Sequence, residues 1–328
     1  MFRDRRPHPF RSLIAAVVLG ASLLAGGSTA GAQTAAALVR IATPGNDGNA
    51  LAYYAQDMGF FKKYAIESQI QAIRAGGGPS VASAVAGGSI DIGESDIITV
   101  ASAREHGIPL VLLAPSFTHR SATAITALVV AKGSPIRTAA ELNGKIIGTP
   151  SLSGPAKVAT DKWLLKNGAD IATIKFVEMP QPSMAAAVVR GTVAAAVTNE
   201  PSLTASLDEV RPLGYPYDAI GNGVQVTAWC ATEEWVRANG DVAKRFVSAI
   251  HEAAVWANNP QNHPASGAIL LKYTPFPPEV LSRMRRATYG EIFDTAFMQP
   301  VLDAAFDEKS LQKRASAKDL LSAVVLTK

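Results

Sequence analysis

The chain has 328 residues, of which 48% are hydrophobic and 18% charged, and its formal net charge is +4. This apolar fraction excludes a disordered chain, and the length allows one large domain or two ordinary ones. The single cysteine excludes a disulfide framework, a cysteine-ligated structural zinc site and a cysteine-held iron–sulfur cluster within the chain.

The first 32 residues have the pattern of a secretory signal peptide. Residues 1–12 hold four arginines and one aspartate, residues 13–25 form a short apolar run, and Ala30-Gly31-Ala32 ends the segment. This order is typical of cleaved export signals, and the run is shorter than the roughly 20 residues of a membrane span. Cleavage leaves a net charge of +1. We therefore expect a soluble periplasmic protein without an arginine-rich surface for nucleic acid.

The segment that follows alternates between strand and helix patterns. Strands are predicted at residues 38–42, 67–74, 89–93 and 109–114, and helices at 50–64 (with a break near Gly59), 80–86 and 97–106. This alternation predicts a mostly parallel sheet covered by helices.

The alternation then starts again and ends in a helical tail. Strands are predicted at residues 127–131, 145–148, 174–178, 194–198 and 224–231, and helices at 155–167, 183–190, 233–239, 242–258, 278–286, 296–306 and 317–325. The last helices have no sheet of their own, so we expect them to pack on the first unit. The fold class is α/β with two lobes, and a ligand cleft is expected where the strand ends of the lobes face each other.

Four short segments carry a family resemblance. They are residues 55–64 (AQDMGFFKKY), 85–93 (VAGGSIDIG), 140–145 (AELNGK) and 194–201 (AAAVTNEP). Together, and in this order, they resemble the periplasmic solute-binding proteins of ABC importers, in the nitrate/sulfonate/taurine or NMT1/THI5-like family.

The resemblance implies a type II periplasmic-binding fold, with two α/β lobes and a hinged cleft. The implied first lobe is residues 33–131 plus 226–328, and the second is residues 132–225. The implied protein is a monomer without cofactor that captures a small anionic or zwitterionic solute, such as a sulfonate, a taurine-like compound or a carboxylate. It delivers the solute to an inner-membrane ABC permease with its ATPase. The alternatives are an enzyme of the same fold acting on a pyrimidine or menaquinone precursor, and a sensory protein that docks on a membrane receptor.

Loops after the first two strands supply candidate ligand-binding residues. Asn46 and Asp47 follow the first strand and either cap the next helix or meet the ligand in the cleft. Gly78 and Ser80 stand between a strand and a helix. They form either a tight turn or a helix start that approaches an anion.

The next candidates follow the third strand and flank the predicted lobe crossings. Ser95 and Asp96 either cap the helix that begins at residue 97 or reach the cleft. Phe117, Thr118 and Trp229 can offer stacking faces or a hydroxyl to the ligand, although a single aromatic residue is more often part of the core.

The second unit contributes the remaining candidates. Ser151, Ser153 and Gly154 precede Pro155, which suits the first position of a helix. The free amides of that helix and the two serine hydroxyls favour an anion or a carbonyl group, unless the serines cap the helix themselves. Glu200 follows a strand and can bind a ligand ammonium group, pair with a cation or cap the next segment.

The histidines and the cysteine do not form a known catalytic or metal-binding motif. Residues 251–255 (HEAAV) begin like a zinc-protease motif but lack its second histidine, and Cys230 lies in an apolar strand, where burial is expected. The sequence therefore predicts no enzyme and no metal site. A counter-charge for the solute is left open among four cations, namely Arg74, Arg120, Lys157 and Arg190.

Overall fold

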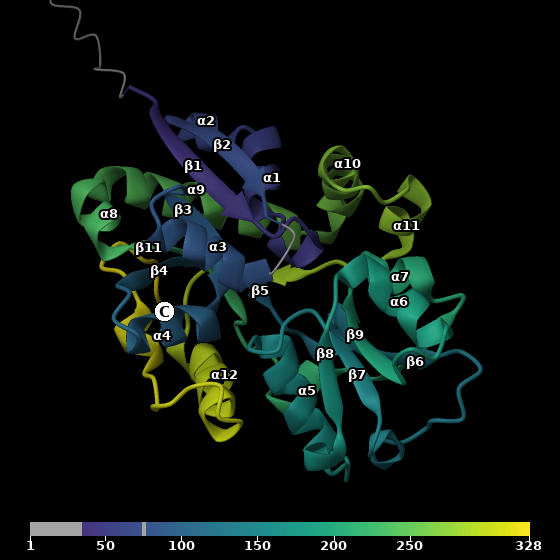
Figure 1. The fold of residues 1–328 in the computed structure, drawn as a ribbon. Helices are drawn as coiled ribbons and strands as arrows, with labels where there is room; N and C mark the ends of the chain where they lie inside the picture. Colours follow the sequence, from purple (N-terminus) through teal and green to yellow (C-terminus); the bar gives the residue numbers. More distant parts are fainter. Residues whose placement is uncertain (1–34, 74–76) are drawn as a thin grey trace, which may run out of the picture. The chain divides into compact units, whose positions relative to one another are not determined.

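The computed structural model describes residues 35–73 and 77–328, so the predicted signal peptide (1–32) and Arg74 lie outside the described residues. In the described part of the chain, two five-stranded sheets are flanked by helices (Figure 1), which confirms the predicted α/β class. Across those same residues, no helix has both the length and the apolar character that crossing a membrane requires.

The first sheet has the strand order β2-β1-β3-β11-β4. Its strands are β1 (Ala37–Thr43), β2 (Ile66–Ala72), β3 (Ile92–Asp96), β4 (Leu110–Pro115) and β11 (Thr227–Thr232). β1 pairs in parallel with β2 and β3, whereas β11 runs antiparallel between β3 and β4. A strand from distant sequence therefore completes the sheet.

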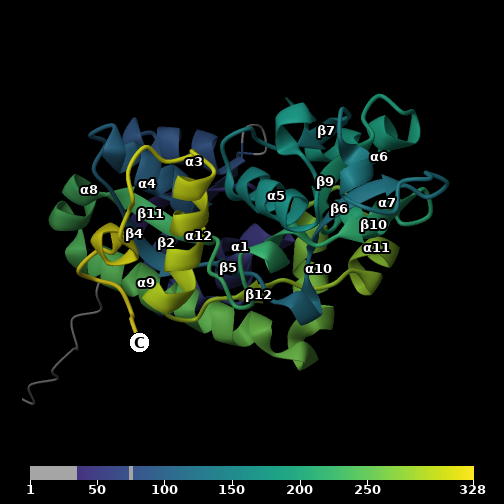
Figure 2. The same ribbon diagram turned by 90° about the horizontal axis from the view of Figure 1, so that it is seen from below.

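The helices of this first unit come from both ends of the chain. They are α1 (Leu51–Asp57), α2 (Phe60–Lys63), α3 (Gly77–Ala86), α4 (Ile97–Glu105), α8 (Glu233–Ala238), α9 (Gly240–Asn258), α10 (His263–Tyr273), α11 (Pro278–Arg283) and α12 (Thr295–Asp307). Gly59, with φ +77°, separates α1 from α2, as expected. Phe246 of α9 and Leu302 of α12 are buried in the same core as Ile41 and Ile92. The C-terminal helices thus pack on the first unit, as predicted, and Figure 2 shows α12 beside α4.

The second sheet has the strand order β10-β6-β9-β7-β8. Its strands and helices are β6 (Thr126–Ala131), β7 (Ile146–Thr149), β8 (Lys175–Glu178), β9 (Ala195–Asn199), β10 (Val210–Gly214), α5 (Pro155–Lys166), α6 (Gln181–Val189) and α7 (Ser202–Ser206). The expected first lobe extended to residue 131, but β6 pairs with β9 and β10, so this boundary is wrong. A uniformly apolar strand such as β6 fits the middle of either sheet, and the sequence does not distinguish them.

Two crossings connect the sheets, at residues 116–125 and 215–226. In the first, the short strand β5 (Phe117–Thr118) pairs with β12 (Thr288–Tyr289). The crossings are joined at His119, whose backbone amide donates to the Val224 carbonyl and whose carbonyl accepts from the Gly223 amide, both at 2.8 Å. The second crossing also contains a 3₁₀ turn, η5 (Pro216–Ala219), which contacts α5.

Candidate functional site

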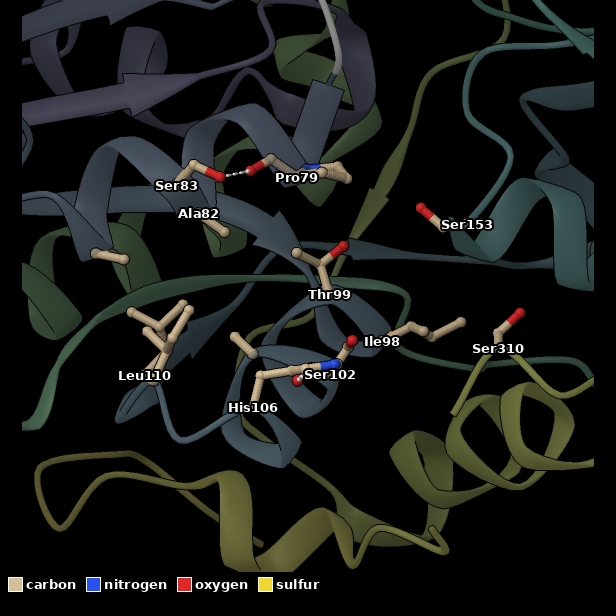
Figure 3. A pocket seen from close by; sticks show the side chains of 13 residues that line it. Pro79, Ala82, Ser83, Ile98, Thr99, Ser102, His106, Leu110, Ser153 and Ser310 are labelled. Atoms are coloured by element: carbon tan, nitrogen blue, oxygen red, sulfur yellow. Dashed lines mark hydrogen bonds between the residues drawn. The ribbon is translucent and has the colours of Figure 1, made fainter. Parts of the chain in front are cut away.

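A groove of about 250 Å³ runs between α3 and α4 and has Ser153 of the second unit at its rim. Its walls include Pro79 and Ala82 of α3, and Thr99 and Ser102 of α4. Figure 3 shows Ser153, which precedes α5, facing Pro79 and Thr99 from across the gap. The starts of α3, α4 and α5 therefore come together where the two units face each other.

The loop before α5 leaves the start of that helix open. Gly154 is the N-cap and has no side chain that could accept a hydrogen bond from the first amides, and Pro155 occupies the first helical position. Ser151 Oγ accepts from the Ser153 amide at 3.3 Å and lies 3.5 Å from Ser153 Oγ, so the serines bind each other rather than cap the helix. The first amides of a helix lack intrahelical acceptors and carry partial positive charge, which favours an anion.

The start of α3 is held by the end of β3. A Cβ atom on Gly78 would lie 2.7 Å from Asp96 Oδ2 and 3.1 Å from Ser95 Oγ, so only glycine fits there. Ser95 Oγ donates to the Gly78 carbonyl at 2.9 Å. Asp96 accepts from the Thr99 amide at 2.8 Å and from Thr99 Oγ1 at 2.7 Å. Ser95 and Asp96 therefore position α3 and cap α4, and half-buried Ser80 lies in the first turn of α3.

Asn46 and Asp47, the two candidates in the loop after β1, have different surroundings. Asp47 is fully buried and forms an ion pair with Arg286 at 2.9 Å, and it accepts from the Ala287 amide at 2.7 Å. Its carboxylate therefore joins this loop to the C-terminal part of the chain. Asn46 is half-buried and makes no capping hydrogen bond to the turn that follows it.

Glu94 is a fully buried carboxyl in the middle of β3 that the sequence analysis did not single out. It accepts from Asn49 Nδ2 at 2.7 Å, Thr43 Oγ1 at 3.1 Å and Thr227 Oγ1 at 3.2 Å. Burial raises the pKa of Glu94 to about 7, against the opposing effect of these donors. Glu94 is visible in the sequence as an acidic residue, but its burial depends on β1 and β11, which lie on either side of β3.

Glu200 lies at the end of β9 and is almost fully buried. Its carboxylate accepts from the Thr204 amide at 3.0 Å and from Thr204 Oγ1 at 2.9 Å, so it caps α7. Burial raises the pKa of Glu200, and the nearby Asp47 acts in the same direction.

The three candidates near the crossings lie in different surroundings. Phe117 is buried and meets the ring of Tyr217 edge-on at 6.2 Å. Thr118 lines a second cavity, separate from the groove at Ser153. Trp229 as a ligand wall is wrong, because β11 lies in the middle of the sheet and the indole packs against Phe246 at 5.4 Å in the core.

Tyr217 occupies a central place that the sequence analysis missed. Its buried ring lies against Phe117 and His119 and belongs to the same cluster as Val158 and Ala159 of α5. Burial raises the pKa of the Tyr217 hydroxyl, and the nearby Asp96 carboxylate adds to this effect. Its neighbours come from both units, and the local sequence YPYDA at residues 215–219 gives no sign of that position.

The other titratable candidates are mostly engaged within the protein. Lys157 pairs with Asp161, and its Nζ lies 4.1 Å from the centre of the Phe176 ring. Arg120 and Arg190 are exposed. Cys230 is buried, as expected, and burial raises the pKa of its thiol to about 12. Over residues 35–73 and 77–328, no cluster of side chains could hold a metal ion.

Comparisons with known proteins identify one family and a set of structures with the same fold. The chain matches the family described as NMT1/THI5 like over residues 46–263, about two thirds of its length. A search of curated protein sequences gave no match.

Three solved structures illustrate the shared fold. The aliphatic sulphonate-binding protein SsuA of Escherichia coli is 21% identical, with a TM-score of 0.70 over 89% of this chain and 94% of that one. SsuA of Xanthomonas axonopodis pv. citri, bound to MOPS, is 20% identical, with a TM-score of 0.71 over 88% and 99%. The nitrate-binding protein NrtA of Synechocystis PCC 6803 is 15% identical, with a TM-score of 0.70 over 88% and 86%.

Proposed function

Because the chain belongs to the NMT1/THI5-like family, we propose that it is the extracytoplasmic solute-binding component of an ABC importer. Its fold is that of the periplasmic binding proteins. In this proposal it captures a small anionic or zwitterionic organic solute, such as a sulfonate, a taurine-like compound or a carboxylate. It then delivers the solute, as a monomer, to a membrane permease that works with an ATPase.

The observation that carries this proposal is the placement of Ser153 opposite the starts of α3 and α4 (Figure 3). The open start of α5 and the hydroxyl groups beside it suit an anionic head group such as a sulfonate or carboxylate. Asn46, Ser80, Ser151, Ser153 and Gly154 are the residues proposed to contact it. The similar structures include sulfonate-binding and nitrate-binding proteins, and this supports the solute class.

The proposed mechanism is closure of two lobes around the solute. We assign the first sheet, with its N- and C-terminal helices, to one lobe and the second sheet, from β6 to β10, to the other. The crossings at residues 116–125 and 215–226 are the proposed hinge. A solute that contacts both lobes binds the closed state more tightly and so shifts the population toward it.

The proposed location outside the cytoplasm rests on the basic, apolar and small-residue pattern of residues 1–32. Two of the similar structures, SsuA of Escherichia coli and NrtA, are periplasmic proteins, which supports this location. A binding role without catalysis is supported by the engagement of the reactive groups. Cys230 is in the core, and His119 is buried with its Nε2 2.8 Å from Asp218 Oδ1.

The test is calorimetry of the purified mature chain with alkanesulfonates, taurine, nitrate and small carboxylates. We expect saturable binding of at least one of these solutes, with an affinity about tenfold lower in Ser153→Ala because one hydrogen bond is lost. Ser282→Ala removes an exposed hydroxyl of α11 and serves as the matched control. Absence of binding across the whole panel would contradict the function, and equal affinities in all three proteins would contradict the site.

A further inference from the structure

A second cavity of about 330 Å³ lies against both crossings, at the β5–β12 pair and the start of α12. Thr118 and Arg120 of the first crossing and Gly223 and Gln225 of the second line it, and Glu291 lies on the first unit. The Ser153 groove has none of these residues in its walls, so the two cavities are separate.

The hydroxyl of Thr118 is a buried polar group without a partner. Thr118 is 4% exposed, and its Oγ1 has no hydrogen bond within the described chain. Successive side chains of a strand point to opposite faces, and the rings of Phe117 and His119 lie against Tyr217. Thr118 therefore points the other way, toward the cavity that it lines. Buried hydroxyls almost always have a partner, and this one is available to a polar atom inside the cavity.

Charges of opposite sign face the same cavity. The Arg120 guanidinium makes no ion pair with any described residue, and its Nη1 lies 3.1 Å from the position that a Cβ on Gly223 would take. Glu291 is exposed, and its Oε1 accepts from Asn258 Nδ2 at 3.1 Å. A guanidinium binds carboxylates in a planar two-point geometry, and a carboxylate binds ammonium groups.

Two further side chains of the cavity wall, Gln225 and Asn258, are held in place by internal hydrogen bonds, and Lys328 Nζ of the same wall lies 3.7 Å from Asp294 Oδ2. Gln225 donates from Nε2 to the Ile292 carbonyl at 2.8 Å and accepts from the Asp294 amide at 3.2 Å. Asn258 is bonded to the backbone of Tyr289 through both ends of its amide, each at 2.9 Å. Fixed walls around available charged groups are the usual design of a small-molecule site.

We propose that this cavity binds a small zwitterion. Its carboxylate pairs with Arg120, its ammonium group pairs with Glu291, and a polar atom between them meets Thr118 Oγ1. The volume lies at the small end of the range of about 300–1,000 Å³ for ligand pockets, which limits the occupant to a compact amino-carboxylate. The proposal does not depend on the solute that the main cleft takes.

The test uses backbone amide NMR spectra of the whole mature chain, titrated with glycine, β-alanine, 4-aminobutyrate and glycine betaine. Acetate and methylamine carry one charge each and are the single-charge comparisons. We expect saturable shifts of the Thr118, Gly223 and Gly290 amides with at least one zwitterion, and at least tenfold weaker binding of both comparison ions.

Variants separate this site from the main cleft. Arg120→Gln and Glu291→Gln should each weaken binding at least tenfold, and Thr118→Val about fivefold. Arg190→Gln, at another exposed arginine, and Ser153→Ala, in the main cleft, should leave the affinity of this second cavity for the zwitterion unchanged. Both charge variants lie on the surface, so their folding can be verified by thermal melting. Absence of saturable shifts with every zwitterion would overturn the proposal. So would an affinity for the zwitterion that is the same in Arg120→Gln and Glu291→Gln as in the wild-type protein.

Discussion

The hydrogen bonds that Glu94 accepts come from neutral side chains, and none of these donors is a cation that could offset the burial of a negative charge. A carboxyl in such surroundings holds its proton more tightly in the folded protein than in the unfolded one. The pKa of about 7, against an ordinary value of 4.5, places this titration near neutral pH. Folding is therefore coupled to protonation of one side chain in the middle of β3.

For Glu94→Gln we expect a stability gain that grows with pH. Wild-type stability falls as the pH rises from about 4.5 through 7, because the folded state binds more protons there. The variant lacks this loss, so its advantage in free energy of unfolding should increase by up to about 3 kcal/mol between pH 4.5 and 8. Urea unfolding across this range measures it, with Glu234→Gln on the surface of α8 as control. A difference that stays constant with pH would contradict the argument.

Asp47 and Arg286 form a buried ion pair, and removal of one partner leaves the other charge uncompensated. For Arg286→Met we expect a loss of about 3–5 kcal/mol in the free energy of unfolding. The double variant Asp47→Asn/Arg286→Met should recover a large part of this loss. Denaturant unfolding of both variants measures the effect, and equal stabilities of the single and double variants would refute it.

Sequence reasoning was most informative where a residue acts on its own neighbours. Asp96 caps the helix that follows it, which was one of its two predicted roles. Asp47 pairs with Arg286, and Trp229 packs against Phe246. These contacts join segments that are far apart along the chain, so no local pattern indicates them. For the same reason Glu94 and Tyr217 were missed.

At the scale of elements, glycines mark where a helix and a strand approach most closely. A Cβ atom on Gly214, at the end of β10, would lie 2.1 Å from the Trp163 ring of α5. The ring is partly buried and packs against the core of the second sheet. The contact between α5 and β10 therefore requires a residue without a side chain.

For Gly214→Ala we expect a loss of about 1–3 kcal/mol in the free energy of unfolding, the usual cost of overpacking. Gly133→Ala is the matched control, because a Cβ there has no neighbour within 4 Å. Thermal and urea unfolding of the two variants measure the difference. Equal stabilities would show that the Trp163 ring moves aside freely.

The elements themselves were largely predictable, because periodicity and turn residues are local properties. The alternating strands and helices, the break at Gly59 and the packing of the C-terminal helices agree with expectation. The membership of β6 in the second sheet was not predictable, and neither was the two-residue pairing of β5 with β12. The predicted helix at residues 317–325 contains only a 3₁₀ turn, Ala317–Leu320.

At the scale of the whole described chain, α5 of the second unit and α12 of the first are in contact (Figure 2). Lys162 Nζ lies 3.1 Å from Asp307 Oδ2, and the two side chains are 28% and 46% exposed. Exposed ion pairs contribute about 0–1 kcal/mol and are screened by salt. This pair is therefore a weak link between the two units.

For Lys162→Gln we expect a solute affinity that changes less than about fivefold at 20 mM NaCl and not at all at 500 mM. Asp241→Asn removes an ion pair inside α9 and is the control. Calorimetry with the solute found in the panel above measures both. A larger effect that persists in high salt would show that this pair holds the closed state together.

The position of β11 also sets the order in which the chain can mature. The first sheet lacks β11, the strand between β3 and β4, until residue 232 has been synthesised. The other four strands are complete at Pro115, where β4 ends. At about 5–20 residues per second, a ribosome needs roughly 6–22 seconds to go from Pro115 to Thr227. During that interval the facing edges of β3 and β4 have no strand between them. The export proposed for this chain requires an unfolded polypeptide, and a first sheet that stays incomplete for this interval favours it.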